Sequence, residues 1–359
     1  MSNLDRYEKI LRRRYTEERL QGAREEMLFA PRFGKDFRYL VESMSQIEPE
    51  STEVTFREAE RVRSQIDKNL SPVYNVNFDF QGSVSNDTHI KRHSDIDLLA
   101  LTGCFWWLDP GEPPPNPYKG DWNQDLNSMR SDVVNILEKN FPTARVDSSP
   151  GKSVEISEGS LARKVDVVIS SWWNTKKWRE TGLKRDRGIK VLDSNGPPLI
   201  SNLPFLHNFR IDEKDLRTNG LRKVIRLLKT LKYDAAPELS ISSYDVAALA
   251  YNMDDSMLNV DPGNYLGLAQ NANSELLRFI AARELRASMS VPNGTRLIFG
   301  NGGASVSGLI DLQSELGALL QRIQHDLRNL NENFSMTKTA SVPSAWTEVR
   351  PRAVLANSF

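Results

Sequence analysis

The chain has 359 residues, of which 39% are hydrophobic, and equal numbers of acidic and basic side chains give a formal net charge of +0. This composition excludes a disordered chain and gives no reason to expect general attraction to nucleic acid or to an anionic membrane. The single cysteine, Cys104, excludes an internal disulfide framework, and no Cys/His cluster predicts a zinc site. Together with a charged N-terminus and no long apolar run, these features predict a soluble cytoplasmic protein without membrane contact.

The first predicted elements are helical. Residues 4–30 are rich in Arg, Glu, Leu and Gln, which predicts one or two polar helices. From residue 52 to residue 70, apolar side chains recur at helical spacing, so a long helix is expected there. The segment 74–80 is the first predicted strand.

The stretch that follows carries the strongest chemical pattern. Gln81, Gly82 and Ser83 form a turn in which backbone N–H groups and a hydroxyl can approach an anion. Asp95 and Asp97 then open an apolar strand and, because side chains alternate along a strand, both carboxylates face the same side. Hard oxygen ligands beside a phosphate-binding turn suggest Mg²⁺ and nucleotide chemistry.

The middle of the chain predicts a small mixed sheet. Residues 104–122 contain five prolines and are expected to form a surface loop. A helix over 123–140 and strands over 144–147, 153–156 and 163–170 follow, which favours an α+β class. Asp166 lies inside the last strand, where a carboxylate needs a partner; a metal ion or a salt bridge would each supply one.

Two basic stretches come next. Residues 176–190 hold an excess of Lys and Arg that could face phosphates or RNA, or could be a solvated loop. The predicted helix 221–233 aligns Arg222, Arg226 and Lys229 opposite its apolar face, and a polyphosphate along this stripe would relieve their repulsion. Ser242 or Ser243 is placed to cap the next helix and could also bind an anion.

The remaining sequence predicts helices over 273–285 and 307–330 and a flexible tail from residue 331. The expected organisation is an N-terminal region with the catalytic core over 1–205, a helical domain over 206–330 and the tail over 331–359.

Taken together, the motifs QGS, SDIDLL and VDVV resemble the nucleotidyltransferase superfamily of DNA polymerase β. With the basic helix and the SSYDV motif beyond it, the chain is most similar to the cGAS/DncV-like nucleotidyltransferases. The resemblance implies a polymerase β-like core with a mixed sheet plus a C-terminal helical domain, in a bilobed arrangement with the active-site cleft between them.

The resemblance also assigns roles to residues. Asp95, Asp97 and Asp166 would hold two Mg²⁺ ions, with Mn²⁺ as a substitute. Gln81, Gly82 and Ser83 would bind nucleotide phosphates, and Lys229 and Ser243 match the family's donor-triphosphate residues, with Arg226 and Ser242 as alternative registers. Tyr244 corresponds to the aromatic residue that stacks on the donor base.

The chain departs from the family pattern in two places. The zinc-binding cluster of the animal DNA sensor has no match, since His89 and His93 lack a third ligand. Asp87 stands where bacterial members typically have glycine, which predicts a changed turn after the Gly-Ser motif.

By this resemblance the enzyme would join NTPs into a cyclic or linear oligonucleotide messenger for antiphage signalling. Its partners would be an activating protein or RNA and a downstream effector that senses the product. Two alternatives stay open: a nucleotidyltransferase that modifies RNA, a protein or a small molecule, and a non-catalytic nucleotide or RNA sensor. A P-loop is disfavoured because Val146 stands where PGKS at Pro150 to Ser153 requires an upstream glycine.

Overall fold

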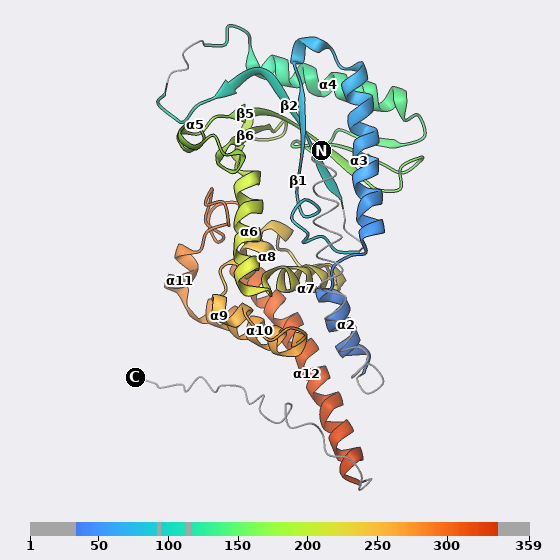
Figure 1. Ribbon diagram of the computed structural model, residues 1–359, viewed down its shortest axis with the longest axis vertical. Coiled ribbons are helices and arrows are strands. Elements are labelled where there is room, and N and C mark those ends of the chain that lie inside the picture. The colour runs from blue at the N-terminus through green and yellow to red at the C-terminus, as the bar shows by residue number, and fades with distance from the viewer. Residues whose placement is uncertain (1–33, 92–94, 113–116, 337–359) are drawn as a thin grey trace.

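The computed structural model describes residues 34–91, 95–112 and 117–336. The predicted helices within residues 4–30, His93 and the chain beyond residue 336 lie outside this range. Within it, a sheet with two covering helices forms one end of the molecule and a group of helices forms the other (Figure 1).

The described part of the sheet is mixed and has seven strands. They are β1 (Asn77–Gln81), β2 (Ile96–Trp107), β3 (Arg145–Asp147), β4 (Val154–Ser157), β5 (Val165–Trp173), β6 (Gly188–Leu192) and β7 (Leu199–Asn202). The strand order is β1-β2-β5-β4-β3, and β6 pairs with the second half of β5 and with β7. Only β2 and β5 are parallel among these pairs. The predicted mixed α+β sheet is confirmed, whereas β6 and β7 were not predicted.

One face of the sheet is covered by two long helices, α3 (Pro49–Asn69) and α4 (Trp122–Asn140). Their apolar stripes pack against the strands, with Phe56 of α3 and Met129 of α4 fully buried. Pro49 at the start of α3 suits the first helical turn, where its missing N–H is not needed. Asp121 caps α4 by accepting hydrogen bonds from the N–H groups of Asn123 and Gln124.

The other face of the sheet carries the acidic residues. Because β2 alternates, Ile96 and Leu98 point into the core under α3 and α4, while Asp97 and Leu99 point the opposite way. On that opposite face Leu99 packs in a smaller cluster that includes Phe205. The predicted alternation, with Ile96 and Leu98 in the core and Asp97 on the other face, is therefore confirmed.

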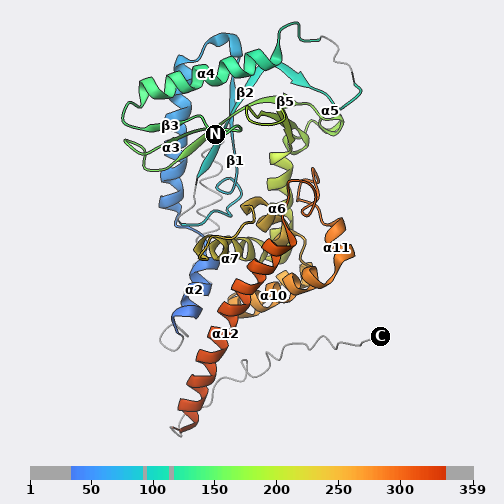
Figure 2. The same ribbon diagram turned by 180° about the vertical axis from the view of Figure 1, so that it is seen from behind.

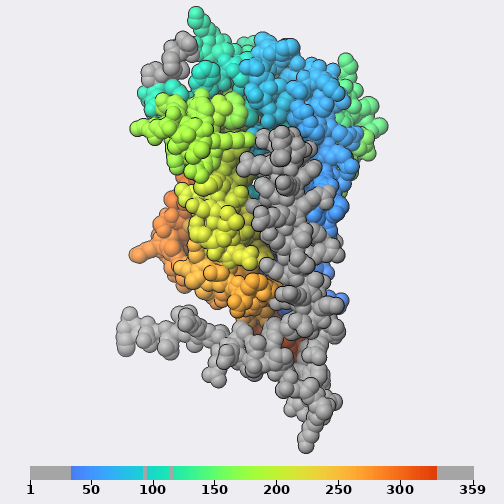
Figure 3. Space-filling view, viewed as in Figure 1, coloured from blue at the N-terminus to red at the C-terminus, as the bar shows by residue number. Residues whose placement is uncertain are grey.

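The helical end has its own core, visible below the sheet from both sides (Figures 1 and 2). Its helices are α2 (Lys35–Met44), α6 (Pro204–Thr218), α7 (Leu221–Asp234), α8 (Ser243–Tyr251), α9 (Asp255–Leu258), α10 (Tyr265–Ala281), α11 (Arg283–Ser288) and α12 (Val306–Met336). In the space-filling view, yellow and orange segments of this group lie below the green and blue sheet end (Figure 3). No described helix is long and apolar enough to cross a membrane.

Three predicted boundaries differ from the structure. The segment before β1 begins as a short 3-10 helix, η1 (Pro72–Tyr74), so the strand starts later than expected. β2 continues through Cys104 to Trp107, where a loop was predicted, because Trp107 donates to the Ser171 hydroxyl across the parallel pair at 2.8 Å. α12 extends to Met336, beyond the predicted start of the tail.

The basic run over 176–190 folds onto aromatic rings. It contains α5 (Lys176–Thr181), the 3-10 helix η2 (Lys184–Asp186) and the start of β6. The Arg187 guanidinium lies 3.8 Å from the Trp172 ring centre and 4.5 Å from that of Trp178. These cation–π contacts occupy the guanidinium faces, so this part of the run is neither a solvated loop nor an open phosphate site.

Candidate active site

Strand register brings four polar side chains into one row across the sheet. Asp97 of β2 is paired with Asp166 of the parallel β5 and with Gln81 of β1. Asp166 is in turn paired with Glu155 of β4. Paired residues in a sheet project to the same face, so two of the three predicted metal ligands lie side by side although 69 positions separate them in the chain.

Asp95, just ahead of β2, joins the row through a lysine that sequence reasoning missed. The Lys164 ammonium lies 3.3 Å from Asp95, 3.2 Å from Asp166 and 3.5 Å from Glu155. Lys164 immediately precedes β5 and could have been noticed as the basic residue two places before Asp166. The structure shows a salt bridge as one partner of Asp166. The three carboxylates around Lys164 carry more negative charge than this one ammonium balances, so a metal ion would also suit the site.

The electrostatics of this row are unfavourable in the protein alone. Burial, and then the neighbouring Asp166 carboxylate, raise the pKa of Asp97 to about 7. Burial raises the pKa of Asp166 to about 6 although Lys164 opposes the shift. Burial would lower the pKa of Lys164, but Asp166 and Asp95 raise it above its ordinary value. An additional positive charge near Asp97 and Asp166 would therefore stabilise their ionised carboxylates.

The residues present fit a divalent cation. Asp166 Oδ1 is buried without a hydrogen-bond partner, and carboxylate oxygens are the ligands that Mg²⁺ prefers. Across the described part of the chain, no three His, Cys, Asp or Glu side chains converge as a ready-made metal centre. The Lys164 ammonium accounts for this arrangement, because it bridges Asp95 and Asp166 where a shared cation would bind.

Gly82 makes room at the edge of the row. Its φ of +86° lies in the left-handed region, and a Cβ there would lie 2.8 Å from Asp97 Oδ2. Any side chain would therefore be strained by the backbone and would collide with a predicted ligand. Ser83 follows directly and lines the same pocket as the acids.

The pocket that contains this row has a volume of about 350 Å³ and receives residues from both ends of the molecule. The sheet end contributes Gln81, Gly82, Ser83 and the three aspartates, and the helical end contributes Lys229, Tyr233, Ser243 and Tyr244. The remaining lining residues are Asn86, Thr88, Asn202, Pro204, His207, Asn208 and Ala247. Nine of the predicted site residues, including Lys229 of α7, thus meet in one cavity.

The structure corrects the prediction for the α7 stripe. Arg222 and Arg226 are 3% and 0% exposed and do not line the pocket. Arg222 pairs with Asp212 and Asp215, and Arg226 donates to backbone carbonyls and lies 3.8 Å from the Asp87 carboxylate. Protein groups therefore relieve the repulsion that was attributed to a polyphosphate. Lys229 alone reaches the pocket, and burial followed by the charge of Lys232 lowers its pKa to about 7.

Of the two predicted serines, likewise, only Ser243 lines the pocket. Ser242 caps α8, since its hydroxyl accepts from the Asp245 N–H at 3.0 Å and donates to the Asp245 carboxylate at 2.6 Å. Ser243 lines the pocket and lies 3.0 Å from the Tyr233 hydroxyl. Tyr244 also lines it, with its ring stacked on His207 at a centroid distance of 4.9 Å. His207 carries no motif that the sequence could reveal.

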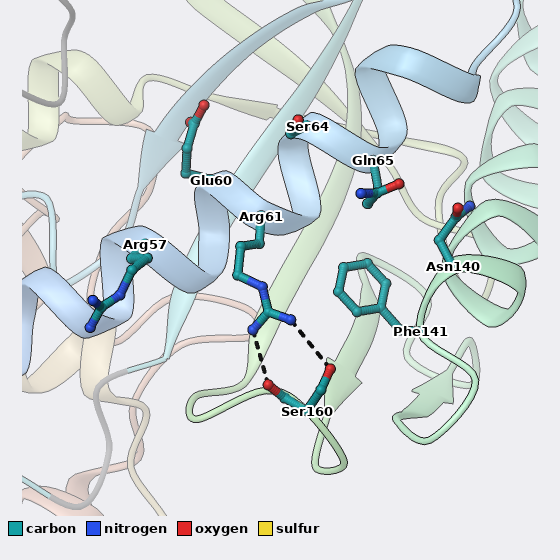
Figure 4. Close-up of a pocket in the computed structure, with 8 residues that line it drawn as sticks. All are labelled: Arg57, Glu60, Arg61, Ser64, Gln65, Asn140, Phe141 and Ser160. Atoms are coloured by element: carbon teal, nitrogen blue, oxygen red, sulfur yellow. Dashed lines mark hydrogen bonds between the residues drawn. The ribbon is translucent and has the colours of Figure 1, made fainter.

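A second and larger cavity, of about 590 Å³, lies away from these residues on the outer side of α3 (Figure 4). Arg61 crosses it and donates to the Ser160 carbonyl at 2.9 Å and to the Ser160 hydroxyl at 3.3 Å. None of the predicted site residues lines this cavity, so its greater size does not make it the reactive centre.

A glycine-serine turn beside paired strand carboxylates, in a pocket shared with the helical end, is the arrangement expected of the nucleotidyltransferase superfamily that the sequence resembles. Residues 210–316 match the model of the cGAS/DncV-like nucleotidyltransferase C-terminal helical domain. A relative from Yersinia aleksiciae, named cyclic dinucleotide synthase CdnE, is 39% identical over 269 residues, which cover 73% of this chain and 70% of the relative.

Further comparisons agree. A relative from Lachnospiraceae bacterium (strain RUG226), named c-di-GMP synthase, is 30% identical, with 60% of this chain and 68% of the relative covered. The solved STING-associated CdnE c-di-GMP synthase from Flavobacteriaceae sp. has the same fold, with a TM-score of 0.69 at 24% identity over 82% of this chain and 89% of that one. The chain belongs to the cGAS/DncV-like nucleotidyltransferases and is an enzyme of that class, which disfavours the non-catalytic sensor.

Proposed function

We propose that the enzyme joins two NTPs into a cyclic dinucleotide, with pyrophosphate released at each of two transfers. The observation that carries the proposal is the register that places Asp97 beside Asp166 in a pocket shared with Ser83 and Lys229. In each transfer a ribose hydroxyl oxygen bonds to the α-phosphorus of the donor. The bond from that phosphorus to the bridging oxygen of pyrophosphate breaks.

Asp95, Asp97 and Asp166 would hold the divalent metal, with two Mg²⁺ ions as the proposed form. When bound, the metal lowers the pKa of the attacking hydroxyl and offsets charge on the α-phosphate. Gln81 lies opposite Asp97 in the β1–β2 pair and would orient it. Asp166 Oδ1 is buried without a hydrogen-bond partner and would serve as one of the metal's ligands.

The leaving pyrophosphate would be held by Ser83, Lys229 and Ser243. Lys229 donates one hydrogen bond to the Thr88 carbonyl at 2.8 Å, which leaves two N–H groups of its ammonium for phosphate oxygens. The stacked rings of His207 and Tyr244 form an aromatic platform at the same pocket, suited to a nucleobase. Asp95, Asp97 and Asp166 are thus assigned to chemistry and the others to binding.

The first substrate to test is GTP, because curated relatives of this chain are named c-di-GMP synthases. The experiment incubates the purified chain with each NTP singly and in pairs, with Mg²⁺ or Mn²⁺, and identifies products by mass spectrometry. We expect a cyclic dinucleotide from NTPs alone. The variant Asp95→Ala with Asp97→Ala serves as the control, and product from that variant would contradict the assignment.

A transferase that modifies RNA, a protein or a small molecule would use the same residues. It would give no dinucleotide from NTPs alone and would release pyrophosphate only when an acceptor is added. In the cell, the cyclic product would signal to a separate effector in antiphage defence, and an activating protein or RNA would control its synthesis.

A further inference from the structure

Three consecutive backbone carbonyls of the loop after β1 accept hydrogen bonds from the basic stripe of α7. Arg222 Nε donates to the Asn86 carbonyl at 2.9 Å, and Lys229 Nζ donates to the Thr88 carbonyl at 2.8 Å. Between them, Arg226 Nη1 donates to the Asp87 carbonyl at 3.1 Å. The three cations lie four and three residues apart on one side of α7, and each donates to one of the three consecutive carbonyls.

The middle contact leads directly to Ser83. The carbonyl that Arg226 holds belongs to the peptide unit between Asp87 and Thr88, and the N–H of that same unit donates to the Ser83 carbonyl at 2.9 Å. A trans peptide unit is planar, with its C=O and N–H on opposite sides. An arginine that fixes the carbonyl therefore also fixes the direction of the N–H that holds Ser83.

Arg226 is itself held at a second point. Its Nε donates to the Met44 carbonyl at the end of α2, at 2.8 Å, and its side chain is fully buried. A guanidinium enclosed in this way cannot touch a nucleotide in the pocket. Its rigid planar set of donors can, however, tie α2, α7 and the loop together in one geometry.

Asp87 completes the arrangement. Its φ of +60° lies in the left-handed region, which a glycine would adopt more readily, yet its carboxylate lies 3.8 Å from Arg226 Nη1. A buried guanidinium needs a counter-charge. The aspartate therefore supplies a charge that glycine would not, which explains why this turn tolerates a strained backbone.

We propose that Arg226 is a positioning residue, which sets the place of Ser83 through the Asp87–Thr88 peptide unit and does not bind the triphosphate itself. The proposal rests on the proposed function, in which Ser83 binds the phosphates of the donor. It predicts that Arg226 and Ser83 act as one unit, so that losing both costs no more than losing the more important one.

The kinetic test compares Ser83→Ala, Arg226→Met and the double variant by pyrophosphate release at varied GTP. We expect each single variant to lose about 10-fold or more in kcat/KM, and the double variant to lose less than about threefold beyond the worse single one. Arg226→Lys retains the charge near Asp87 and should lose less than Arg226→Met. Losses that multiply in the double variant would overturn the proposal.

Arg130 offers a matched control. This arginine of α4 is also buried, and its Nη2 donates to three loop carbonyls, those of Ser148, Pro150 and Ser153, on the side of the sheet away from the pocket. Arg130→Met should cost comparable stability but leave kcat/KM within about twofold of the unsubstituted enzyme. Equal kinetic losses in both arginine variants would mean that Arg226 acts only through stability.

Hydrogen–deuterium exchange of the full chain without metal or nucleotide provides a readout that is independent of activity. Arg226→Met should speed exchange in peptides covering residues 83–89, whereas Arg130→Met should do so only over residues 148–154. Unchanged exchange over 83–89 would contradict the proposal whatever the kinetics show. Full activity in Ser83→Ala would instead contradict the role of Ser83 in the proposed function, while the exchange result would still decide the place of Arg226.

Discussion

The described part of the chain contains two contrasting rows of like charges, one on the sheet and one on α7. On the sheet, Asp97, Asp166 and nearby Asp95 gather around one lysine, and the pKa values of Asp97 and Asp166 are raised. On α7, Arg222 and Arg226 are neutralised by aspartates and carbonyls of the protein itself. The sequence shows both rows as runs of charge in apolar elements.

The difference lies in what completes each row. The basic row has its partners within the fold, so its charges stabilise a loop. The acidic row has less positive charge than its carboxylates require, so a bound cation or protonation of Asp97 would stabilise it. Charge runs with internal partners serve structure, and those without them indicate binding.

The largest expected effect comes from removing the acidic row. The variant Asp95→Asn with Asp97→Asn should lower product formation by about 10³-fold or more, because the ligands for the metal and its charge stabilisation are lost. Its melting temperature should stay the same or rise, since a buried carboxylate with a raised pKa destabilises the fold. Calorimetry and mass spectrometry of products check both, and an unfolded variant would contradict the comparison.

The basic row should show the opposite behaviour. Arg222→Met removes the cation that pairs with Asp215, whose side chain is only 18% exposed, so we expect a loss of about 3–5 kcal/mol in unfolding free energy. Urea denaturation measures it. Arg210→Met is the control on α6, because the Arg210 side chain is exposed and lies 4.0 Å from Glu213; its effect should be below about 0.5 kcal/mol.

A histidine beside the basic row makes stability depend on pH. Burial, and then Lys229 and Arg226, lower the pKa of His89 to about 3, so the folded state keeps it neutral. The unfolded state binds a proton near pH 6.5, and the contribution of His89 to stability should therefore fall by about 3 kcal/mol as pH drops from 6.5 towards 4. In His89→Gln this slope should be smaller, as judged by melts across that range. An equal dependence of melting temperature on pH in the two proteins would show that His89 is not the source of the acid sensitivity.

Substituting Lys164 tests the acidic row by removing its cation instead of its carboxylates. In Lys164→Met the ammonium no longer competes for Asp95 and Asp166, so we expect Mn²⁺ to bind about 3–10-fold more tightly, while the metal-free protein melts at a lower temperature. Isothermal titration calorimetry without nucleotide measures the affinity. Lys152→Met removes another lysine of the same sheet region and should leave Mn²⁺ binding unchanged.

The smallest expected effect concerns Asp87. Alanine and glycine at this position both remove the carboxylate near Arg226, but only glycine accepts a φ of +60° without strain. Asp87→Ala should therefore be less stable than Asp87→Gly by about 1 kcal/mol in chemical denaturation. Equal stabilities would show that the loop changes its conformation once the carboxylate is gone.

Sequence patterns predicted the sheet, the helix stripes and the three aspartates, because alternation and helical spacing are local properties. The strand that contains Ile96 and Asp97 was readable from residues two apart, and a cap at Ser242 or Ser243 from the neighbouring sequence, of which the structure selects Ser242. β6 and β7 were missed although they form a local antiparallel pair, because the basic residues before β6 and the prolines before β7 disfavour strands.

The site residues that sequence reasoning missed or misplaced depend on long-range contacts. Lys164 acquires its role only when β5 brings it to Asp95, and His207 only when α6 brings it onto Tyr244. Arg226 and Lys229 belong to the same stripe, and only the path of the loop shows that the first is enclosed and the second reaches the pocket.

The position of Lys164 also bears on the order in which a growing chain can assemble. β1 and β2 are synthesised well before β5, so Asp95 and Asp97 leave the ribosome without their parallel neighbour. Lys164 precedes Asp166 by two residues, so the strand that adds the third acid also delivers the offsetting cation. During synthesis, the acidic row is therefore never complete without its own counter-charge.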